Sequence, residues 1–89
     1  MGDGLVLDCQ SDLLAHLNTR VVVPLIPVGR APTPAGRFNP IFAIDGQDVA
    51  MDTQFISSIE RRHLGAVVCS LADRSFEITD ALDVLISGV

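Results

Sequence analysis

Apolar and polar positions along the chain form short alternating runs until a longer helical pattern begins near residue 70. Gly4 to Asp8 (GLVLD) alternates weakly and predicts a short strand. Arg20 to Val28 (RVVVPLIPV) is a β-branched run that Pro24 and Pro27 interrupt. Because proline cannot donate to a strand ladder, this run is predicted to be an edge strand, a bulged strand or a sharply bent one.

A hairpin is the best local signal in the sequence. Pro40 to Ile44 and Gln47 to Thr53 are two strand-like runs that flank the pair Asp45-Gly46. This pair tolerates the positive φ angles of a two-residue hairpin turn, whose twist matches that of the strands. Before the hairpin, Gly29 to Arg37 holds two glycines and two prolines and predicts an exposed loop.

The segment after the hairpin is less regular. Gln54 to Ile59 is expected either to continue the strand or to turn, and Glu60 to Gly65 is a charged connection. Ala66 to Cys69 (AVVC) predicts a last short strand.

The C-terminal pattern predicts a helix. Ser70 followed by Asp73 resembles a capping box at its start, and Gly88 is a terminator at its end. One apolar face recurs at helical spacing: Leu71, Ile78, Leu82 and Leu85. Three further apolar residues lie off this stripe: Phe76, Val84 and Ile86. They indicate that the end of the helix meets another chain.

These elements predict a single domain over residues 1–89 that is mainly β, with an antiparallel sheet closed as a small curved sheet or partly open barrel and one C-terminal helix. A chain of 89 residues with 48% hydrophobic residues has more apolar surface than a small monomer can bury, so a homodimer is expected. The net charge of −5 argues against binding DNA or RNA directly and favours a protein partner with a basic patch. No run has the roughly 18 apolar residues of a membrane span, and a cytoplasmic protein is expected.

Candidate chemistry is sparse. Cys9 and Cys69 lack a second cysteine at metal or redox spacing, so both are predicted to be buried, reduced thiols. His16 and His63 are isolated from other ligand types and are predicted to be solvated. No nucleophile elbow or phosphate-binding glycine loop is present, so neither an enzyme nor a cofactor is expected.

Four segments carry a resemblance to a known family: Asp8 to Leu14 (DCQSDLL), Arg20 to Leu25 (RVVVPL), Asn39 to Phe42 (NPIF) and Met51 to Thr53 (MDT). They resemble the CcdB family of toxins from bacterial toxin–antitoxin modules. The C-terminal stretch extends the match through Leu71-Ala72-Asp73-Arg74, Ile78, Ala81, Leu82 and Gly88-Val89. The resemblance therefore covers nearly the whole chain.

This resemblance implies an SH3-like barrel with a C-terminal helix, a homodimer and no enzymatic activity. Its members insert their paired C-terminal ends between the A subunits of DNA gyrase, and a CcdA antitoxin with a disordered tail neutralises them. The family context also implies plasmid maintenance and transcriptional autoregulation. Carried over by position, the gyrase-binding residues are Leu13, Leu14, Asp83, Ile86, Ser87, Gly88 and Val89. The alternative for Leu13, Leu14 and Ile86 is that they belong to the core or the dimer interface.

The chain departs from the family pattern at both ends. Ser87 replaces a tryptophan, the residue most enriched at interface hot spots, and Asp83 replaces an amide with a charge. Family members also have a strand before the equivalent of Leu5, whereas this chain opens at Met1-Gly2-Asp3-Gly4. A start placed too late, a trimmed chain and divergence each explain that difference.

Three functions stay open from sequence. The first is a CcdB-like toxin that binds gyrase and an antitoxin, and the second is a non-toxic descendant, which Ser87 favours. The third is a ribonuclease toxin of the MazF barrel, against which the net charge of −5 argues. The Gly29 to Arg37 loop with its neighbouring strand edge is the candidate antitoxin contact.

Overall fold

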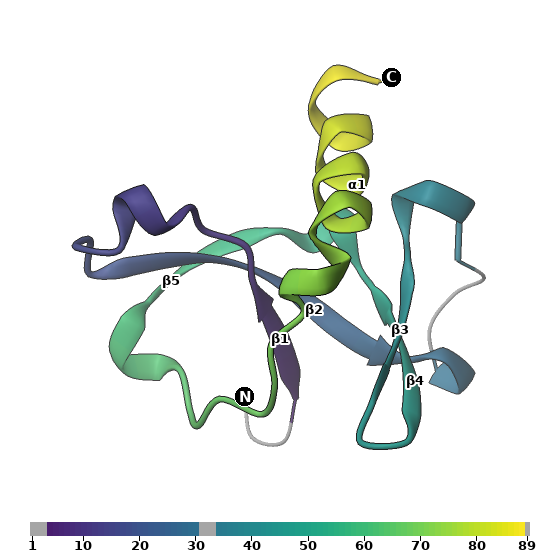
Figure 1. Cartoon of the computed structure of the whole chain (residues 1–89), viewed down its shortest axis with the longest axis horizontal. Helices are drawn as coiled ribbons and strands as arrows, with labels where there is room; N and C mark the ends of the chain where they lie inside the picture. The colour runs from purple at the N-terminus through teal and green to yellow at the C-terminus, as the bar shows by residue number, and fades with distance from the viewer. Residues whose placement is uncertain (1–3, 31–33, 89) are drawn as a thin grey trace.

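The structure, a computed structural model, describes residues 4–30 and 34–88, and these form a five-stranded antiparallel sheet with one C-terminal helix (Figure 1). The strands are β1 (Leu5–Asp8), β2 (Thr19–Pro27), β3 (Ile41–Ile44), β4 (Gln47–Met51) and β5 (Ser57–Glu60), and the helix is α1 (Ser75–Ser87). The sheet curls into a half-barrel, which confirms the predicted fold class.

Strand β2 is the centre of the sheet. It pairs with β1 through Val22 to Leu25, with β5 through Thr19 to Val22, and with β4 through Leu25 to Pro27. Val22 and Leu25 therefore have ladder partners on both sides. The prediction of an edge strand for this run was wrong.

The reason lies in the position of Pro24. The edge of β2 that faces β4 and β5 is interrupted there, because a 3-10 turn, η4 (Thr53–Phe55), separates those two strands. The N–H that proline lacks falls at this interruption, while the Pro24 carbonyl accepts a hydrogen bond from the Asp52 N–H at 2.9 Å. A proline is thus tolerated in a central strand.

The predicted hairpin is confirmed. Strands β3 and β4 pair in register from Ile44–Gln47 outwards, and the turn residues Asp45 and Gly46 have φ angles of 52° and 78°. Both values lie in the left-handed region that a type I′ turn requires. The hairpin carries the largest buried side chain, that of Phe42, into the core.

The segment before the hairpin was predicted to be an exposed loop, and its described residues form no strand or α-helix. Two 3-10 turns, η2 (Val28–Arg30) and η3 (Gly36–Phe38), bracket the part of Gly29 to Arg37 that lies outside the description. The described Gly29, Arg30 and Arg37 are exposed.

Helix α1 packs one face on the sheet while its C-terminal end projects away from it (Figure 1). Ala81 is fully buried, and Ile78 and Leu82 pack against the core, as the periodicity predicts. Leu85 was predicted to lie on the packed face and Val84 off it. The structure shows the reverse, because Leu85 is exposed and Val84 is half-buried.

The helix begins later than predicted. The Ser70 hydroxyl accepts the Ala72 N–H at 3.2 Å and so stabilises a separate 3-10 turn, η6 (Ala72–Arg74). Arg74 then occupies the N-cap position of α1 without a side-chain capping bond. The capping-box motif was therefore wrong as a marker of the helix start.

The predicted strand at Ala66 to Cys69 was also wrong. These residues are irregular and exposed, with Val67 at 89% exposure. Strand-forming residues make a strand only where a neighbouring edge supplies hydrogen bonds, and here none pairs with them in the described part of the sheet. Cys69 is therefore exposed rather than buried, contrary to prediction.

Candidate interaction surface

The Asp-x-Gln-Ser motif after β1 builds the loop that carries Leu13 and Leu14. Asp8 forms a two-bond ion pair with Arg20, at 2.8 and 3.1 Å, which fastens β1 to β2. Gln10 donates to the Leu14 carbonyl at 2.9 Å and accepts the Val21 N–H at 3.1 Å. The motif therefore has a structural role: it ties the loop to the central strand.

The loop itself is a 3-10 turn, η1 (Asp12–Leu14), with Ser11 as its N-cap. The Ser11 hydroxyl accepts the Leu13 N–H at 3.2 Å. On the far side the Arg61 guanidinium donates to the carbonyls of Ala15 and Leu17. These bonds hold the turn while its apolar side chains stay in water.

Leu13 and Leu14 are both exposed, Leu13 at 88%. The alternative that they are core residues is wrong for this chain. A rigid turn that presents apolar side chains to solvent is typical of a binding surface.

The end of α1 is the second exposed region. Asp83, Ile86, Ser87 and Gly88 are all exposed, Ile86 at 79%, so Ile86 is not a core residue either. Gly88 adopts a left-handed conformation with φ of 74°, and its N–H bonds the Val84 carbonyl at 3.0 Å, which confirms it as the terminator. Val89 lies outside the described residues.

The structure does not bring these two regions into one patch of a single chain. Figure 1 shows η1 at one end of β2 and the tip of α1 projecting from the sheet at a separate place. The sequence groups them only through the family resemblance.

Two ion pairs involve α1, one to the η3 turn and one within the start of the helix itself. Arg37, in η3, binds Asp80 with two hydrogen bonds of 2.9 and 2.6 Å. The hydrogen bond and the charge of Arg37 hold the pKa of Asp80 below its ordinary value. Arg74 pairs with Glu77 one turn further along, and this contact likewise lowers the pKa of Glu77.

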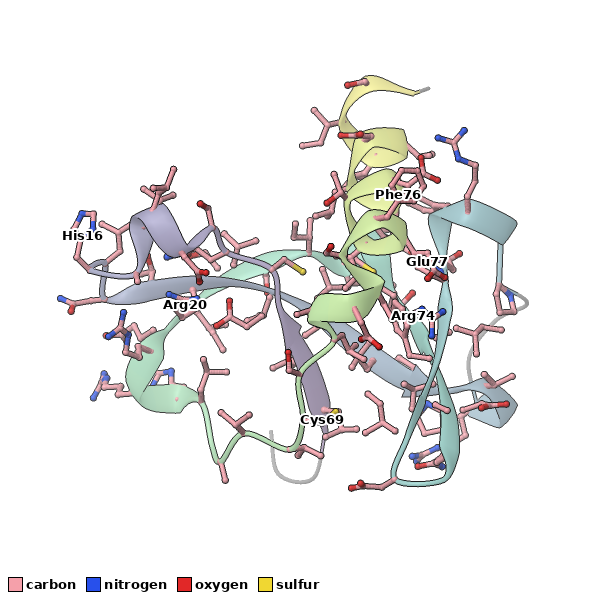
Figure 2. The ribbon with its side chains drawn as sticks, viewed as in Figure 1. His16, Arg20, Cys69, Arg74, Phe76 and Glu77 are labelled. Carbon is pink, nitrogen blue, oxygen red and sulfur yellow. The ribbon has the colours of Figure 1, made fainter. Side chains whose placement is uncertain are left out.

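Arg74 also reaches beyond its own helix. It donates to the Ile41 carbonyl at 3.3 Å, and its guanidinium lies over the Phe42 ring. Figure 2 shows Arg74, Phe76 and Glu77 together at the base of α1. The sequence predicted no contact with helix α1 for Arg37 and no contact with the hairpin for Arg74. The i,i+3 spacing of Arg74 and Glu77 was an available signal, whereas no local signal joins Arg37 to Asp80.

The remaining reactive groups among the described residues form no site. Burial raises the pKa of the Cys9 thiol to about 11, and the Asp8 carboxylate adds to the rise, so Cys9 is protonated at neutral pH. His16 and His63 are exposed, as predicted, and Figure 2 shows His16 at the η1 end of the molecule. Within residues 4–30 and 34–88 no metal-binding group of His, Cys, Asp and Glu occurs. No helix in that same part of the chain has the length and apolarity to cross a bilayer.

These features define the class: a small curled antiparallel half-barrel that presents apolar side chains on a braced turn and at the end of a projecting helix. A family model described as CcdB protein matches residues 2–88, and the chain belongs to the CcdB family. It is thus a CcdB-like protein of the toxin–antitoxin type, in a family of non-catalytic toxins. No curated protein matches the chain.

Proposed function

We propose that this protein is a toxin that inhibits DNA gyrase without catalysis, by binding through the C-terminal tips of a homodimer. The observation that carries the proposal is the exposure of Leu13 on a braced turn and of Ile86 at the end of the projecting helix. Each buried CH₂ group contributes about 0.8 kcal/mol on transfer from water, so a partner gains free energy by covering these side chains.

The proposed contact surface combines two apolar regions with polar groups. Leu13 and Leu14 supply one region and Ile86 the other, while the remaining members are Asp83, Ser87, Gly88 and Val89. Pairing two copies about a two-fold axis would double each region and set the tips side by side. The partner in this proposal is the A subunit of gyrase.

A CcdA-like antitoxin completes the proposal. The net charge of −5 favours a basic, disordered segment as the neutralising partner. Within Gly29 to Arg37, five of the six described residues are exposed and the loop leads to the start of β3, which supports this loop as a contact. The module would act in the cytoplasm, where it would serve plasmid maintenance and regulate its own transcription.

The decisive experiment is controlled expression together with a gyrase supercoiling assay on the purified protein. The proposal expects growth arrest, rescue by the product of the adjoining basic reading frame, and loss of supercoiling. Leu13→Ser and Ile86→Ser should each weaken the inhibition, whereas the matched exposed control Phe55→Ser should not. Full growth and undiminished supercoiling at high expression would refute the proposal.

A second candidate rests on Ser87. A tryptophan at this position would bury a large aromatic surface in the target, and the loss of such an anchor commonly costs about 2 kcal/mol or more, roughly 30-fold in affinity. A descendant that dimerises and binds antitoxin but no longer poisons gyrase is the alternative function. Antitoxin binding without gyrase inhibition would favour it.

A further inference from the structure

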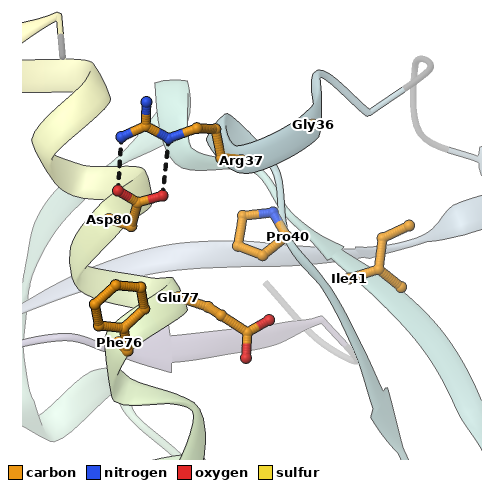
Figure 3. A pocket seen from close by; sticks show the side chains of 7 residues that line it. All are labelled: Gly36, Arg37, Pro40, Ile41, Phe76, Glu77 and Asp80. Carbon is orange, nitrogen blue, oxygen red and sulfur yellow. Dashed lines mark hydrogen bonds and ion pairs between the residues drawn. The ribbon is translucent and has the colours of Figure 1, made fainter.

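A groove separates the first turns of α1 from the corner where η3 leads into β3 (Figure 3). It is called the Phe76 groove below, and its lining includes Phe76, Glu77 and Asp80 on the helix and Arg37, Pro40 and Ile41 opposite. Its volume is about 230 Å³. This is below the roughly 300 Å³ at which pockets for drug-sized ligands begin, so one inserted side chain suits it better than a cofactor.

The two walls of the Phe76 groove are apolar and exposed. Phe76 is 84% exposed on the helix, and Ile41 is 42% exposed across from it. Figure 3 shows the Phe76 ring on one wall with Pro40 and Ile41 on the other. Isolated exposed apolar side chains are common, but Phe76, Pro40 and Ile41 line one hollow, with the Glu77 side chain between its two sides, and form a local apolar patch.

The rim of the Phe76 groove is acidic. Glu77 and Asp80 line the groove, and the charges of Asp83 and Asp73 act on Arg37 and Arg74, so four carboxylates stand around it. They outnumber the guanidinium groups of Arg37 and Arg74, which already pair with Asp80 and Glu77. The last turn of α1 contains no basic residue. The excess negative charge attracts cationic groups and repels a nucleic acid.

The walls are also held in place before any partner arrives. The two bonds between Arg37 and Asp80 join the walls at one end, and the bond from Arg74 to the Ile41 carbonyl joins them at the other. A preformed site loses less conformational entropy on binding.

We propose that the Phe76 groove docks a peptide segment of a protein partner, one that places a large apolar side chain between basic residues. The apolar side chain lies between Phe76 and Ile41, and the basic residues lie beside Asp73 and Asp83, which do not take part in the ion pairs with Arg37 and Arg74. This surface lies at the base of α1 and shares only Asp83 with the proposed gyrase-facing residues, so the inference does not depend on gyrase inhibition.

The test is an NMR titration of the full ¹⁵N-labelled chain with the capped synthetic peptide Gly-Lys-Arg-Leu-Lys-Arg-Gly. Amide shifts are expected to concentrate at Arg37, Ile41, Phe76 and Glu77. Phe76→Ser should raise the Kd about tenfold, because an aromatic contact in an interface centre commonly contributes more than 1 kcal/mol. Serine and phenylalanine have similar helix propensities, so α1 should persist.

Two controls separate the groove from nonspecific attraction. Phe55→Ser removes another exposed phenylalanine, one that does not line the groove, and should leave the Kd unchanged. A peptide with Ala in place of Leu should bind more weakly, and one with Glu in place of Lys and Arg should not bind. Equal binding of the peptides, or shifts centred elsewhere, would overturn the proposal. Sedimentation that shows Phe76→Ser dissociating a dimer would overturn it too, because a second copy would then occupy the groove.

Discussion

The guanidinium of Arg74 lies over the ring of Phe42, with its central carbon 4.8 Å from the ring centre. Phe42 is only 1% exposed and belongs to the main core cluster, whereas Arg74 stands at the N-cap of α1. This contact connects the β3–β4 hairpin to the start of the helix. The hairpin therefore contributes to holding the base of the helix in place.

Replacing Phe42 should destabilise the fold strongly. Phe42→Ala leaves a cavity under Arg74 and is expected to lower the free energy of unfolding by about 3–5 kcal/mol. Urea denaturation followed by circular dichroism measures this loss. The matched change Phe55→Ala, at a side chain with 61% exposure, should alter stability by about 0.5 kcal/mol or less. Similar losses for the two variants would contradict the assignment of the core.

The ion pair of Arg37 and Asp80 should make stability depend on acid pH. The pKa of Asp80 is lowered in the folded chain, so its contribution is fully present above the unfolded value of about 3.9 and is lost as pH falls through the folded value. Asp80→Asn should be slightly less stable than wild type at pH 7 and equal to it in strong acid. Urea midpoints of both proteins from pH 7 to pH 2 test this convergence. A constant difference across the range would contradict it.

The turn between β3 and β4 requires glycine at position 46. Gly46 has a φ of 78°, and a side chain there meets no neighbouring atom but does strain the backbone. Gly46→Ala should cost about 1–2 kcal/mol. Gly65→Ala is the matched control, because its added Cβ also meets open space and its φ lies outside the strained region. Thermal unfolding of both variants measures the difference, and equal stability would argue against the turn geometry.

The two cysteines should differ in reactivity. Cys9 has a pKa of about 11 and is half-buried, whereas Cys69 is exposed. Because the thiolate is the reactive form, iodoacetamide at pH 8 should alkylate Cys69 much faster than Cys9. Peptide mass spectrometry after timed quenching identifies the modified residue. Faster labelling of Cys9 would show that β1 opens readily.

Ser87→Trp distinguishes the two proposed functions. The tip is exposed, so the substitution should leave folding intact and add a large aromatic surface where the target is expected. A gain of gyrase inhibition in the supercoiling assay would show a scaffold that lacks only its aromatic anchor. Ser58→Trp, at an exposed position on β5, is the control. Unchanged activity of Ser87→Trp would point to another target.

The sequence predicted correctly those features that adjacent residues determine, and it failed where distant strands determine the structure. The Asp45-Gly46 turn and the Gly88 terminator are set by backbone preferences of adjacent residues, and both predictions were confirmed. The central place of β2 depends on three partner strands, which its prolines do not reveal. Residues 66–69 have strand propensity without a partner edge and stay irregular.

The candidate surface divides in the same way. The sequence left open whether Leu13 and Ile86 are exposed binding residues or belong to the core or dimer interface. Their exposure in the folded chain rules out the core. The Arg37–Asp80 pair joins residues 43 positions apart, and no periodicity within either segment indicates it. The sequence therefore did not predict the groove that residues 36–41 form with Phe76, Glu77 and Asp80, although it did place Phe76 off the apolar stripe.

The three-sided pairing of β2 has a consequence for how the chain opens. Fraying of β1, β4 or β5 alone leaves β2 bonded to the other two, so local fluctuations cannot release the whole strand. Val22 and Leu25 are buried in this strand, so their amides should be among the slowest of the sheet to exchange with solvent. The projecting end of α1 has no such protection, and the molecule therefore couples a slowly exchanging spine to a tip that can adapt to a partner within the native state.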